Sequence, residues 1–119
     1  MLTVTKRFEF DYAHFLPGYE GKCSRLHGHR GVLEVEVSGP PLEAGEVYDS
    51  MVVDFGVLKG VVKDKIVDKL DHTLVNELMH VPTAENMARW VWRELRDVFG
   101  SNLVKIRVYE TPNSWAEFS

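Results

Sequence analysis

Two stretches in the first third of the chain alternate between apolar and polar residues with the two-residue period of a half-buried β-strand. In residues 4–14, one parity holds a series of ring side chains: Phe8, Phe10, Tyr12 and His14. In residues 27–37, one parity holds an aliphatic series: Leu33, Val35 and Val37. Residues 15–26 between them contain a proline and two glycines. The pattern therefore predicts an antiparallel hairpin closed by a long loop.

The apolar period changes from two to four residues at Phe55, which is typical of amphipathic helices. The first helical series contains four aliphatic residues: Leu58, Val62, Ile66 and Leu70. The second series follows Pro82 and Thr83, which favour a helix N-terminus, and it ends at Gly100. Its members are Met87, Val91, Leu95 and Val98. Residues 71–82, between the two helices, are expected to form a loop.

The remaining segments add turns and further strands to the hairpin and the two helices. Residues 38–46, SGPPLEAGE, have the composition of turns, and residues 47–53 predict a short third strand. Residues 104–110 alternate again and place Glu110 in line with three apolar residues: Val104, Ile106 and Val108. Residues 115–118 predict a short last strand. The order β-β-β-α-α-β-β predicts an α+β fold whose two helices pack on one face of an antiparallel sheet.

Composition narrows the class of protein. The 119 residues are expected to form a single domain, and 45% hydrophobic with 27% charged residues argues against disorder. The net charge of −4 disfavours nucleic acid or an anionic membrane as the main partner. One cysteine forms no internal disulfide, and the first ten residues lack an apolar signal segment. We therefore expect a cytoplasmic protein, and its small core favours association with copies of itself.

The histidines are the strongest chemical signal. His27 and His29 flank one glycine, so on a strand both side chains point to the same face, and His14 has the inward parity at the end of the first strand. In a hairpin these ends are adjacent, so three imidazoles are expected to converge. Clustered neutral imidazoles are typical ligands of Zn²⁺, and three protein ligands leave a fourth position open, as in catalytic sites. The alternative is that one or two of them are ordinary core or loop histidines.

The only cysteine, Cys23, lies in a polar loop four residues before His27. A lone cysteine is most often a small buried hydrophobic residue. Here it could also be a fourth zinc ligand that closes a structural site, or a base or nucleophile that acts as a thiolate. The spacing alone leaves these hypotheses open.

Six segments, in order along nearly the whole chain, resemble the 6-pyruvoyl-tetrahydropterin synthase family and its bacterial and archaeal relatives: FDYAHFL, CSRLHGH, MVVDFGVLK, LDHTLVN, PTAENMARWVW and VYETPNSWAEF. Within the family, three residues between the cysteine and the paired histidines, as between Cys23 and His27, are typical of 6-carboxy-5,6,7,8-tetrahydropterin synthase of the queuosine pathway. The pyruvoyl-forming enzymes more often have five. Gly31 departs from the pattern, because many relatives have an aromatic or other bulky residue there.

The resemblance implies the tunnelling fold (T-fold), in which subunits join through their sheets into a trimeric barrel and two trimers stack into a homohexamer with sites between subunits. It implies a zinc-dependent lyase that converts 7,8-dihydroneopterin triphosphate to 6-carboxytetrahydropterin, acetaldehyde and triphosphate. Zinc would be held by three residues of this chain: His14, His27 and His29.

The resemblance also implies roles for other residues. Cys23 would remove a proton from the substrate side chain, and Asp71 would orient His72 as its partner in proton transfer. The spacing gives no indication that this pair reaches the zinc loop of its own subunit, so we expect a neighbouring subunit to contribute to the site. Glu110 would accept the two adjacent N–H donors of the pterin, as an inward carboxylate needs a partner.

The remaining assignments rest on less. Thr83 would cap its helix or contact the pterin, and Arg25 would meet the triphosphate, although a solvated surface charge explains it equally. Two alternative functions stay open. One is 6-pyruvoyl-tetrahydropterin synthase or a related pterin enzyme with the same ligands. The other is a non-catalytic zinc-binding module in which Cys23 completes the coordination.

Overall fold

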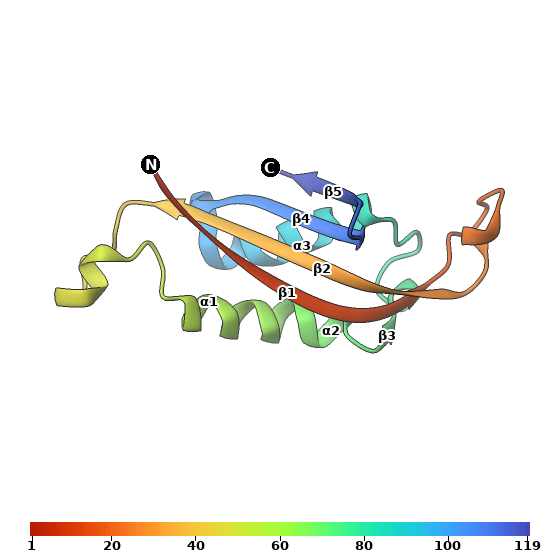
Figure 1. The fold of residues 1–119 in the computed structure, drawn as a ribbon, viewed down its shortest axis with the longest axis horizontal. Coiled ribbons are helices and arrows are strands. Elements are labelled where there is room, and N and C mark those ends of the chain that lie inside the picture. Colours follow the sequence, from red (N-terminus) through yellow and green to blue (C-terminus); the bar gives the residue numbers. More distant parts are fainter.

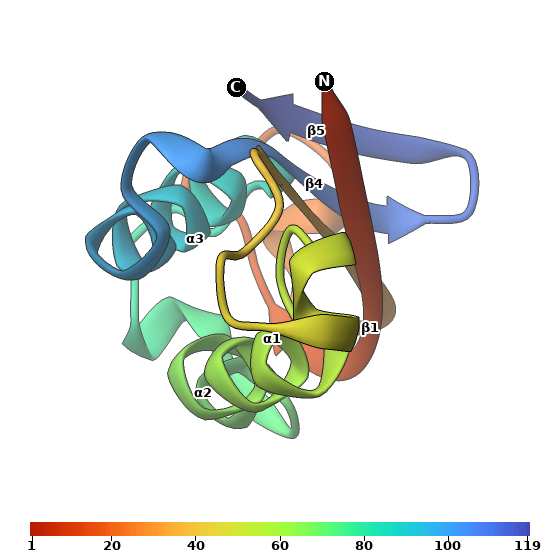
Figure 2. The same cartoon turned by 90° about the vertical axis from the view of Figure 1, so that its left-hand side faces the viewer.

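The computed structural model describes residues 1–119 as a curved five-stranded sheet with its helices on one face (Figures 1 and 2). The order of strands is β3-β1-β2-β4-β5. The strands are β1 Leu2–His14, β2 His27–Gly39, β3 Thr73–Leu74, β4 Leu103–Thr111 and β5 Ser114–Phe118. The helices are α1 Phe55–Val62, α2 Asp68–Leu70 and α3 Ala84–Phe99. The predicted α+β class is confirmed, and no helix has the length and apolar character needed to cross a membrane.

The hairpin of β1 and β2 runs the length of the molecule (Figure 1). Its register joins Leu2 to Gly39 at one end and His14 to His27 at the other, without a bulge. Because side chains alternate between faces, the ring series of β1 and the aliphatic series of β2 lie on the same inner face. The loop of residues 15–26 closes the hairpin at the end where the histidines lie.

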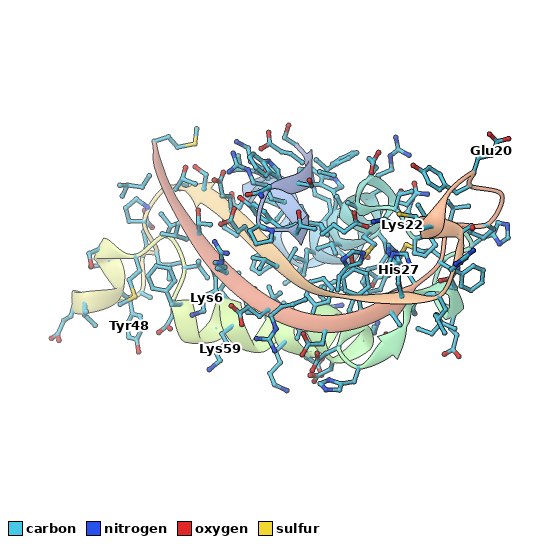
Figure 3. All side chains as sticks on the ribbon, turned by 45° about the vertical axis from the view of Figure 1, so that its right-hand side comes forward. Lys6, Glu20, Lys22, His27, Tyr48 and Lys59 are labelled. Carbon is cyan, nitrogen blue, oxygen red and sulfur yellow. The ribbon has the colours of Figure 1, made fainter.

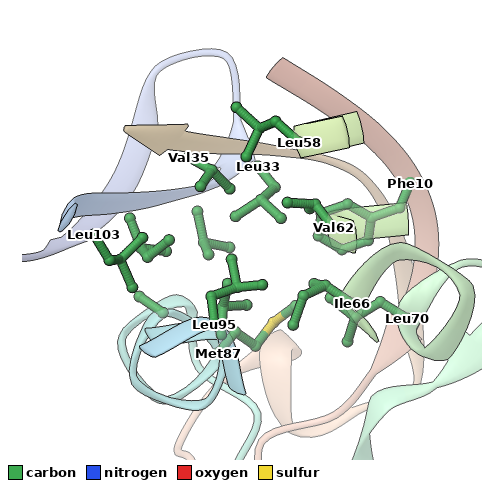
Figure 4. Packing of buried hydrophobic residues seen from close by; sticks show 14 of the residues in the cluster. Phe10, Leu33, Val35, Leu58, Val62, Ile66, Leu70, Met87, Leu95 and Leu103 are labelled. Atoms are coloured by element: carbon green, nitrogen blue, oxygen red, sulfur yellow. The ribbon is translucent and has the colours of Figure 1, made fainter. Parts of the chain in front are cut away.

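The core lies between the inner face of the sheet and the helices (Figure 4). Phe10, Leu33 and Val35 cover the sheet side, and all are at most 2% exposed. The helical series fill the other side, including Leu58, Ile66, Leu70, Met87 and Leu95, each with no exposed surface. The last residue of the second series, Val98, is exposed and lies outside the core. Burial of this apolar surface is the main contribution to the stability of the chain.

The first helix is interrupted by a π-helical turn over Lys63–Val67. In an α-helix a side chain four positions on is rotated about 40° past a full turn, so a strict four-residue series would drift off the core. The wider turn corrects this drift, because Leu58, Val62, Ile66 and Leu70 are all fully buried. The prediction of a helical segment was therefore right, but the prediction of one uninterrupted α-helix was wrong.

Two predictions are corrected by the structure: the strand over residues 47–53, and the loop over residues 71–82, which contains β3. Residues 47–53 form no strand: a 3₁₀ turn covers Glu46–Ser50. The third strand is instead the two-residue β3, which pairs parallel to β1. Two hydrogen bonds between the backbone of Phe15 and the side chain of Asn76 fasten this segment to the end of β1, at 3.0 and 2.9 Å. A strand this short carries no periodicity, and only its long-range bonds create it.

The start of β4 also differs from the prediction. The register to β2 shifts between Glu36 and Val37, so Val37 pairs with Leu103 and Glu36 with Lys105. Leu103 is therefore buried, and Val104, predicted to point inward, is the extra residue of a β-bulge. Beyond the bulge the predicted parity holds, since Ile106 and Val108 are fully buried.

Gly31 is buried on β2 under two aromatic rings of β1. A Cβ atom at this position would lie 2.7 Å from Cζ of Phe10 and 2.9 Å from Cε1 of Tyr12. Phe10 and Tyr12 are stacked on each other, with ring centroids 5.3 Å apart, so neither ring can move aside freely. The missing side chain of Gly31 thus makes room for aromatic rings from the neighbouring strand.

We expect Gly31→Ala to destabilise the protein by about 1–3 kcal/mol, the usual cost of overpacking a filled core. Chemical denaturation would measure the change in the free energy of unfolding. Gly60→Ala is the matched control, because Gly60 lies in α1 and nothing approaches the position of its Cβ within 4 Å. Alanine there should be neutral or stabilising. A Gly31→Ala variant as stable as the wild type would contradict the packing described here.

Candidate metal and catalytic site

Three histidines converge at the closed end of the hairpin. His14 ends β1, and His27 and His29 begin β2, where the register places His14 opposite His27. The Nε2 atoms of His14 and His27 are 3.0 Å apart, and one ring nitrogen of each of the three lies within 4.8 Å of the others. Figure 3 shows His27 beside the loop that carries Lys22. The convergence expected from strand parity is what the structure contains.

Backbone carbonyls orient two of the rings. Nδ1 of His14 donates to the carbonyl of Pro82 at 2.8 Å, and Nδ1 of His27 donates to that of Arg25 at 2.6 Å. With Nδ1 protonated in both rings, each Nε2 of a neutral imidazole presents a lone pair to the other. Such lone pairs repel at this distance unless a proton or a cation lies between them.

The spacing of the histidines fits a metal ion. Ligand atoms on a zinc ion with bonds of about 2.0–2.1 Å are about 3.3 Å apart. The distance between Nε2 of His14 and Nε2 of His27 is 3.0 Å, and all three histidines have a ring nitrogen within 4.8 Å of the others. Beside this cluster, Oε1 of Glu110 lies 3.4 Å from Nε2 of His14 and 3.5 Å from that of His29. Nε2 of His29 is buried and has no hydrogen-bond partner. The carbonyl contacts to Nδ1 are the outer partners that metal-binding histidines require.

Burial favours the neutral rings of His14 and His29, which is the form that binds metal. Desolvation lowers the pKa of His14 and that of His29, and the adjacent histidines lower both further. The carboxylate of Glu110 opposes the shift without reversing it.

We expect the metal-free protein to lose stability as the pH falls below the ordinary histidine pKa of 6.5. The folded state has the lowered pKa, so below 6.5 the unfolded chain binds more protons and protonation favours unfolding. Thermal unfolding of chelator-treated protein between about pH 7.5 and pH 5 would measure the loss. His29→Gln should flatten the profile, whereas the same change at exposed His80 should not. A profile that His29→Gln leaves unchanged would contradict the assignment.

Glu110 sits near the end of β4, two residues beyond the buried Val108 and on the same face. Its side chain is 32% exposed, so the carboxylate lies between the buried histidines and the solvent. It also lines an open pocket of about 370 Å³ with Ala84 and Trp115. A carboxylate that reaches both a metal site and a pocket of this size can hold a small polar ligand beside the metal.

Tyr12 is a member of the cluster that the sequence analysis did not single out. It pairs with His29 across the hairpin, and its ring centroid lies 5.2 Å from that of His14 and 5.6 Å from that of His29. The residue is 4% exposed, and its hydroxyl has no hydrogen-bond partner. Burial and the negative charge of Glu110 raise the pKa of Tyr12, so the hydroxyl stays protonated. The signal in the sequence was a polar atom on the inward parity, two residues before His14.

Cys23 lies in a 3₁₀ turn, Lys22–Ser24, of the hairpin loop and is partly buried. Its sulfur is not among the ligand atoms that gather within 4.8 Å at the three histidines. The backbone carbonyl of Cys23 accepts a hydrogen bond from the amide of Leu16 at 2.9 Å, which ties the turn to the chain just after His14. The structure thus keeps the thiol near the histidines' end of the hairpin but outside their cluster.

Asp71 and His72 form a second, separate group at the edge of β1. The backbone N–H of Asp11 donates to the Asp71 carboxylate at 2.8 Å, and Nδ1 of His72 lies 3.0 Å from the other carboxylate oxygen. The first of these bonds is the main cause of the lowered pKa of Asp71. His72 has a φ of +59°, which is rare outside glycine, and its side chain is 78% exposed.

This second group does not converge with the first within one chain. Asp11 has the opposite parity to His14 on β1, so the aspartate and histidine pair faces away from the inner cluster. The His72 imidazole is oriented, exposed and free to meet another surface.

The last two candidate residues, Thr83 and Arg25, lie outside both groups. The side chain of Thr83 accepts a hydrogen bond from the backbone N–H of Asn86 at 3.1 Å, which is an N-cap of α3. Arg25 is exposed, and its carbonyl, not its guanidinium, contacts His27.

Comparison with known proteins shows the family of the chain. The family model described as 6-pyruvoyl tetrahydropterin synthase matches residues 3–119. The chain belongs to this family. It is 37% identical to the 6-carboxy-5,6,7,8-tetrahydropterin synthase of Haemophilus influenzae over 99% of both chains. It is 36% identical to the protein of the same name from Synechocystis, over 99% of this chain and 93% of that one.

Solved structures of the 6-pyruvoyl tetrahydropterin synthase family share the fold. The structure of the Caenorhabditis elegans 6-pyruvoyl tetrahydropterin synthase superposes with a TM-score of 0.83 at 26% identity, covering 98% of this chain and 94% of that one. The expected T-fold is therefore confirmed for the single chain. The relatives span this chain from end to end, so the histidines, Glu110 and the Asp71–His72 pair all lie within the family domain.

Proposed function

We propose that the protein is a zinc-dependent 6-carboxy-5,6,7,8-tetrahydropterin synthase, a lyase that acts on 7,8-dihydroneopterin triphosphate. The observation that carries this proposal is the cluster of three histidines, with Glu110 beside two of them, in a chain that aligns end to end with relatives of that name. The products would be 6-carboxytetrahydropterin, acetaldehyde and triphosphate, with queuosine biosynthesis as the downstream pathway.

His14, His27 and His29 would hold the metal. A bound zinc ion supplies Lewis acidity toward the oxygens of the substrate side chain. The carbonyls of Pro82 and Arg25 hold the rings of His14 and His27 with their Nε2 atoms toward each other, where the ion would bind. Because desolvation already favours the neutral rings of His14 and His29, little competition from protons remains at neutral pH.

Glu110 would bind the pterin ring. A carboxylate can accept both adjacent N–H groups of a pterin in one plane, and the open pocket beside Glu110 gives the ring access. The same carboxylate faces the histidines, so a ring held there places its side chain next to the metal. Thr83, one residue before Ala84 at the pocket, caps α3 and fixes the position of the pocket wall.

Cys23 would remove a proton from the substrate side chain, and His72 would exchange protons with Cys23 or the substrate. Asp71 orients His72 through the contact at 3.0 Å and stabilises its imidazolium form. Because this pair faces away from the cluster of its own chain, His72 would serve the cluster of a second copy. This supports a homo-oligomer with shared sites, for which we propose a hexamer of two trimers. Arg25, exposed on the metal loop, would meet the triphosphate.

The direct test is to incubate the zinc-loaded protein with 7,8-dihydroneopterin triphosphate and to identify the products by mass spectrometry. We expect 6-carboxytetrahydropterin and an equal amount of trapped acetaldehyde. A 6-pyruvoyl product without acetaldehyde would assign the protein to the pyruvoyl-forming branch instead. An unchanged substrate would contradict both and leave a zinc-binding module, a reading that the position of Cys23 outside the histidine cluster disfavours.

We expect Glu110→Gln to weaken pterin binding by about tenfold to a hundredfold, because a charge-assisted hydrogen bond is worth about 1.5–3 kcal/mol. The amide keeps the shape of the side chain, so the zinc content should not change. The ligand-free variant should be no less stable, since a partly buried carboxylate is replaced by a neutral group. Titration with sepiapterin would measure the affinity, and equal affinities would remove Glu110 from the site.

A further inference from the structure

The hydroxyl of Tyr12 is a buried polar group without a partner. The residue is 4% exposed, and the oxygen is enclosed by protein without any hydrogen bond. Buried hydroxyls in native proteins nearly always have a partner, and each exception calls for an explanation. Phenylalanine would fill the same space without leaving a donor unpaired, so packing alone does not explain a tyrosine here.

The position of the ring limits where that partner can be. Phe10 stacks against one side of the Tyr12 ring, and His14 and His29 contact its other surfaces. The ring reaches over the bare Cα of Gly31, because a Cβ there would lie 2.9 Å from its Cε1 atom.

Glu110 lies beside the same two histidines that contact Tyr12. Its Oε1 atom is 3.4 Å from Nε2 of His14 and 3.5 Å from Nε2 of His29. The phenol therefore lies over a position of β2 that has no side chain, in the group of rings that the Glu110 carboxylate approaches. The electrostatic influence of Glu110 on the Tyr12 hydroxyl agrees with this arrangement.

Glu110 has unused acceptor capacity. A carboxylate offers about four lone-pair sites, and a pterin bound in bidentate fashion occupies two of them. In this structure Oε1 of Glu110 faces His14 and His29. A carboxylate turned toward a pterin in the open pocket no longer makes these contacts and needs a donor on its buried side. Tyr12 is the buried hydroxyl on that side.

We infer that Tyr12 is a positioning residue for ligand binding: its hydroxyl donates a hydrogen bond to the carboxylate of Glu110 and holds that carboxylate in the plane that binds a pterin. This inference rests on the proposed function, because it needs Glu110 to bind a pterin. Gly31 takes part by leaving room for the Tyr12 ring over β2. The hydroxyl contacts neither the reacting atoms nor the ligand, and acts only through Glu110.

The test uses Tyr12→Phe, which removes one oxygen atom and keeps the ring. In the zinc-loaded protein, we expect sepiapterin to bind about ten- to a hundredfold more weakly, as for loss of a hydrogen bond to a charged group. Zinc content should be unchanged, and the melting temperature without ligand should be equal or higher, since an unpaired buried hydroxyl is gone. A merely structural role would lower the melting temperature instead. Tyr48→Phe, at the opposite end of the molecule (Figure 3), is the matched control and should bind like the wild type.

The same substitution in the Glu110→Gln variant tests whether the effect of Tyr12 depends on Glu110. In Glu110→Gln protein, the added Tyr12→Phe change should weaken binding much less than in the wild type, because an amide oxygen accepts a weaker bond than a carboxylate. Equal sepiapterin affinity for the wild type and Tyr12→Phe would overturn the inference and leave the proposed function standing. An equal loss in both backgrounds would overturn it too, because the hydroxyl would then act on another group. Failure of the wild type itself to bind sepiapterin would overturn the proposed function and this inference with it.

Discussion

A His27→Ala, His29→Ala double variant is expected to retain almost no zinc, whereas the purified wild type should carry close to one ion per chain. Removing two of three protein ligands leaves His14 as the only imidazole of the cluster, and one imidazole does not hold a structural or catalytic zinc ion. Elemental analysis after dialysis against a weak chelator would measure the content. The effect should be close to complete, which makes it the largest that we expect.

The matched control for this experiment is His80→Ala. His80 is exposed and lies outside the cluster, so its loss should leave the zinc content unchanged. A single His14→Ala change should also deplete zinc strongly, because His14 is the fully buried ligand with a carbonyl contact to Pro82. Full zinc occupancy in the double variant would refute the site as described.

Cys23→Ala is expected to lower turnover by about 10²–10⁴-fold, the usual contribution of a positioned proton-transfer group. Zinc content and sepiapterin affinity should change little, because the sulfur lies outside the group of ligand atoms at the histidines. Steady-state turnover of dihydroneopterin triphosphate, with zinc analysis of the same samples, measures both quantities. His72→Ala should behave in the same way. A Cys23→Ala variant that keeps full activity would exclude the thiol as the base, whereas one that loses zinc would make it a ligand.

The two variants also test whether sites are shared between subunits. Cys23→Ala and His72→Ala proteins that are coexpressed should form mixed oligomers, in which some sites receive an intact cysteine from one chain and an intact histidine from another. We expect partial recovery of activity in these mixtures. Mixed oligomers without recovered activity would place both residues in a site made by one chain, contrary to the opposite facing of the two groups in this structure.

Strand parity predicted the histidine cluster because the side chains of a β-strand alternate between its two faces, so sequence spacing determines the face on which each side chain lies. His27 and His29 share a face whatever else the chain does, and a regular antiparallel hairpin must place the end of β1 beside the start of β2. The same reasoning placed Glu110 on the inner face, although the bulge shifted Leu103 and Val104 at the other end of the strand. Local alternation therefore placed the histidines and Glu110 correctly, and it failed at Val104, where the bulge adds a residue.

Strand parity could not predict the contacts of Asp71 and His72. Their segment is held to the edge of β1 by bonds between residues 60 or more positions apart, such as that from Asp11 to Asp71. Those bonds also create β3 and the left-handed backbone of His72, neither of which has a periodic signal. The resemblance to the tetrahydropterin synthases named the pair, but it did not say which way the pair faces.

By itself, the sequence determined the α+β class, the hairpin, the two helical segments and the inward parity of the histidines. These features depend on the local period of apolar residues, and the core selects that period because burial is the main stabilising term. Only the tertiary structure decided the separation of Cys23 from the histidine cluster, the outward Asp71–His72 pair, and the position of the Tyr12 ring over Gly31. Each of these depends on contacts between distant segments, where packing and hydrogen bonding across the fold override any local preference of the chain.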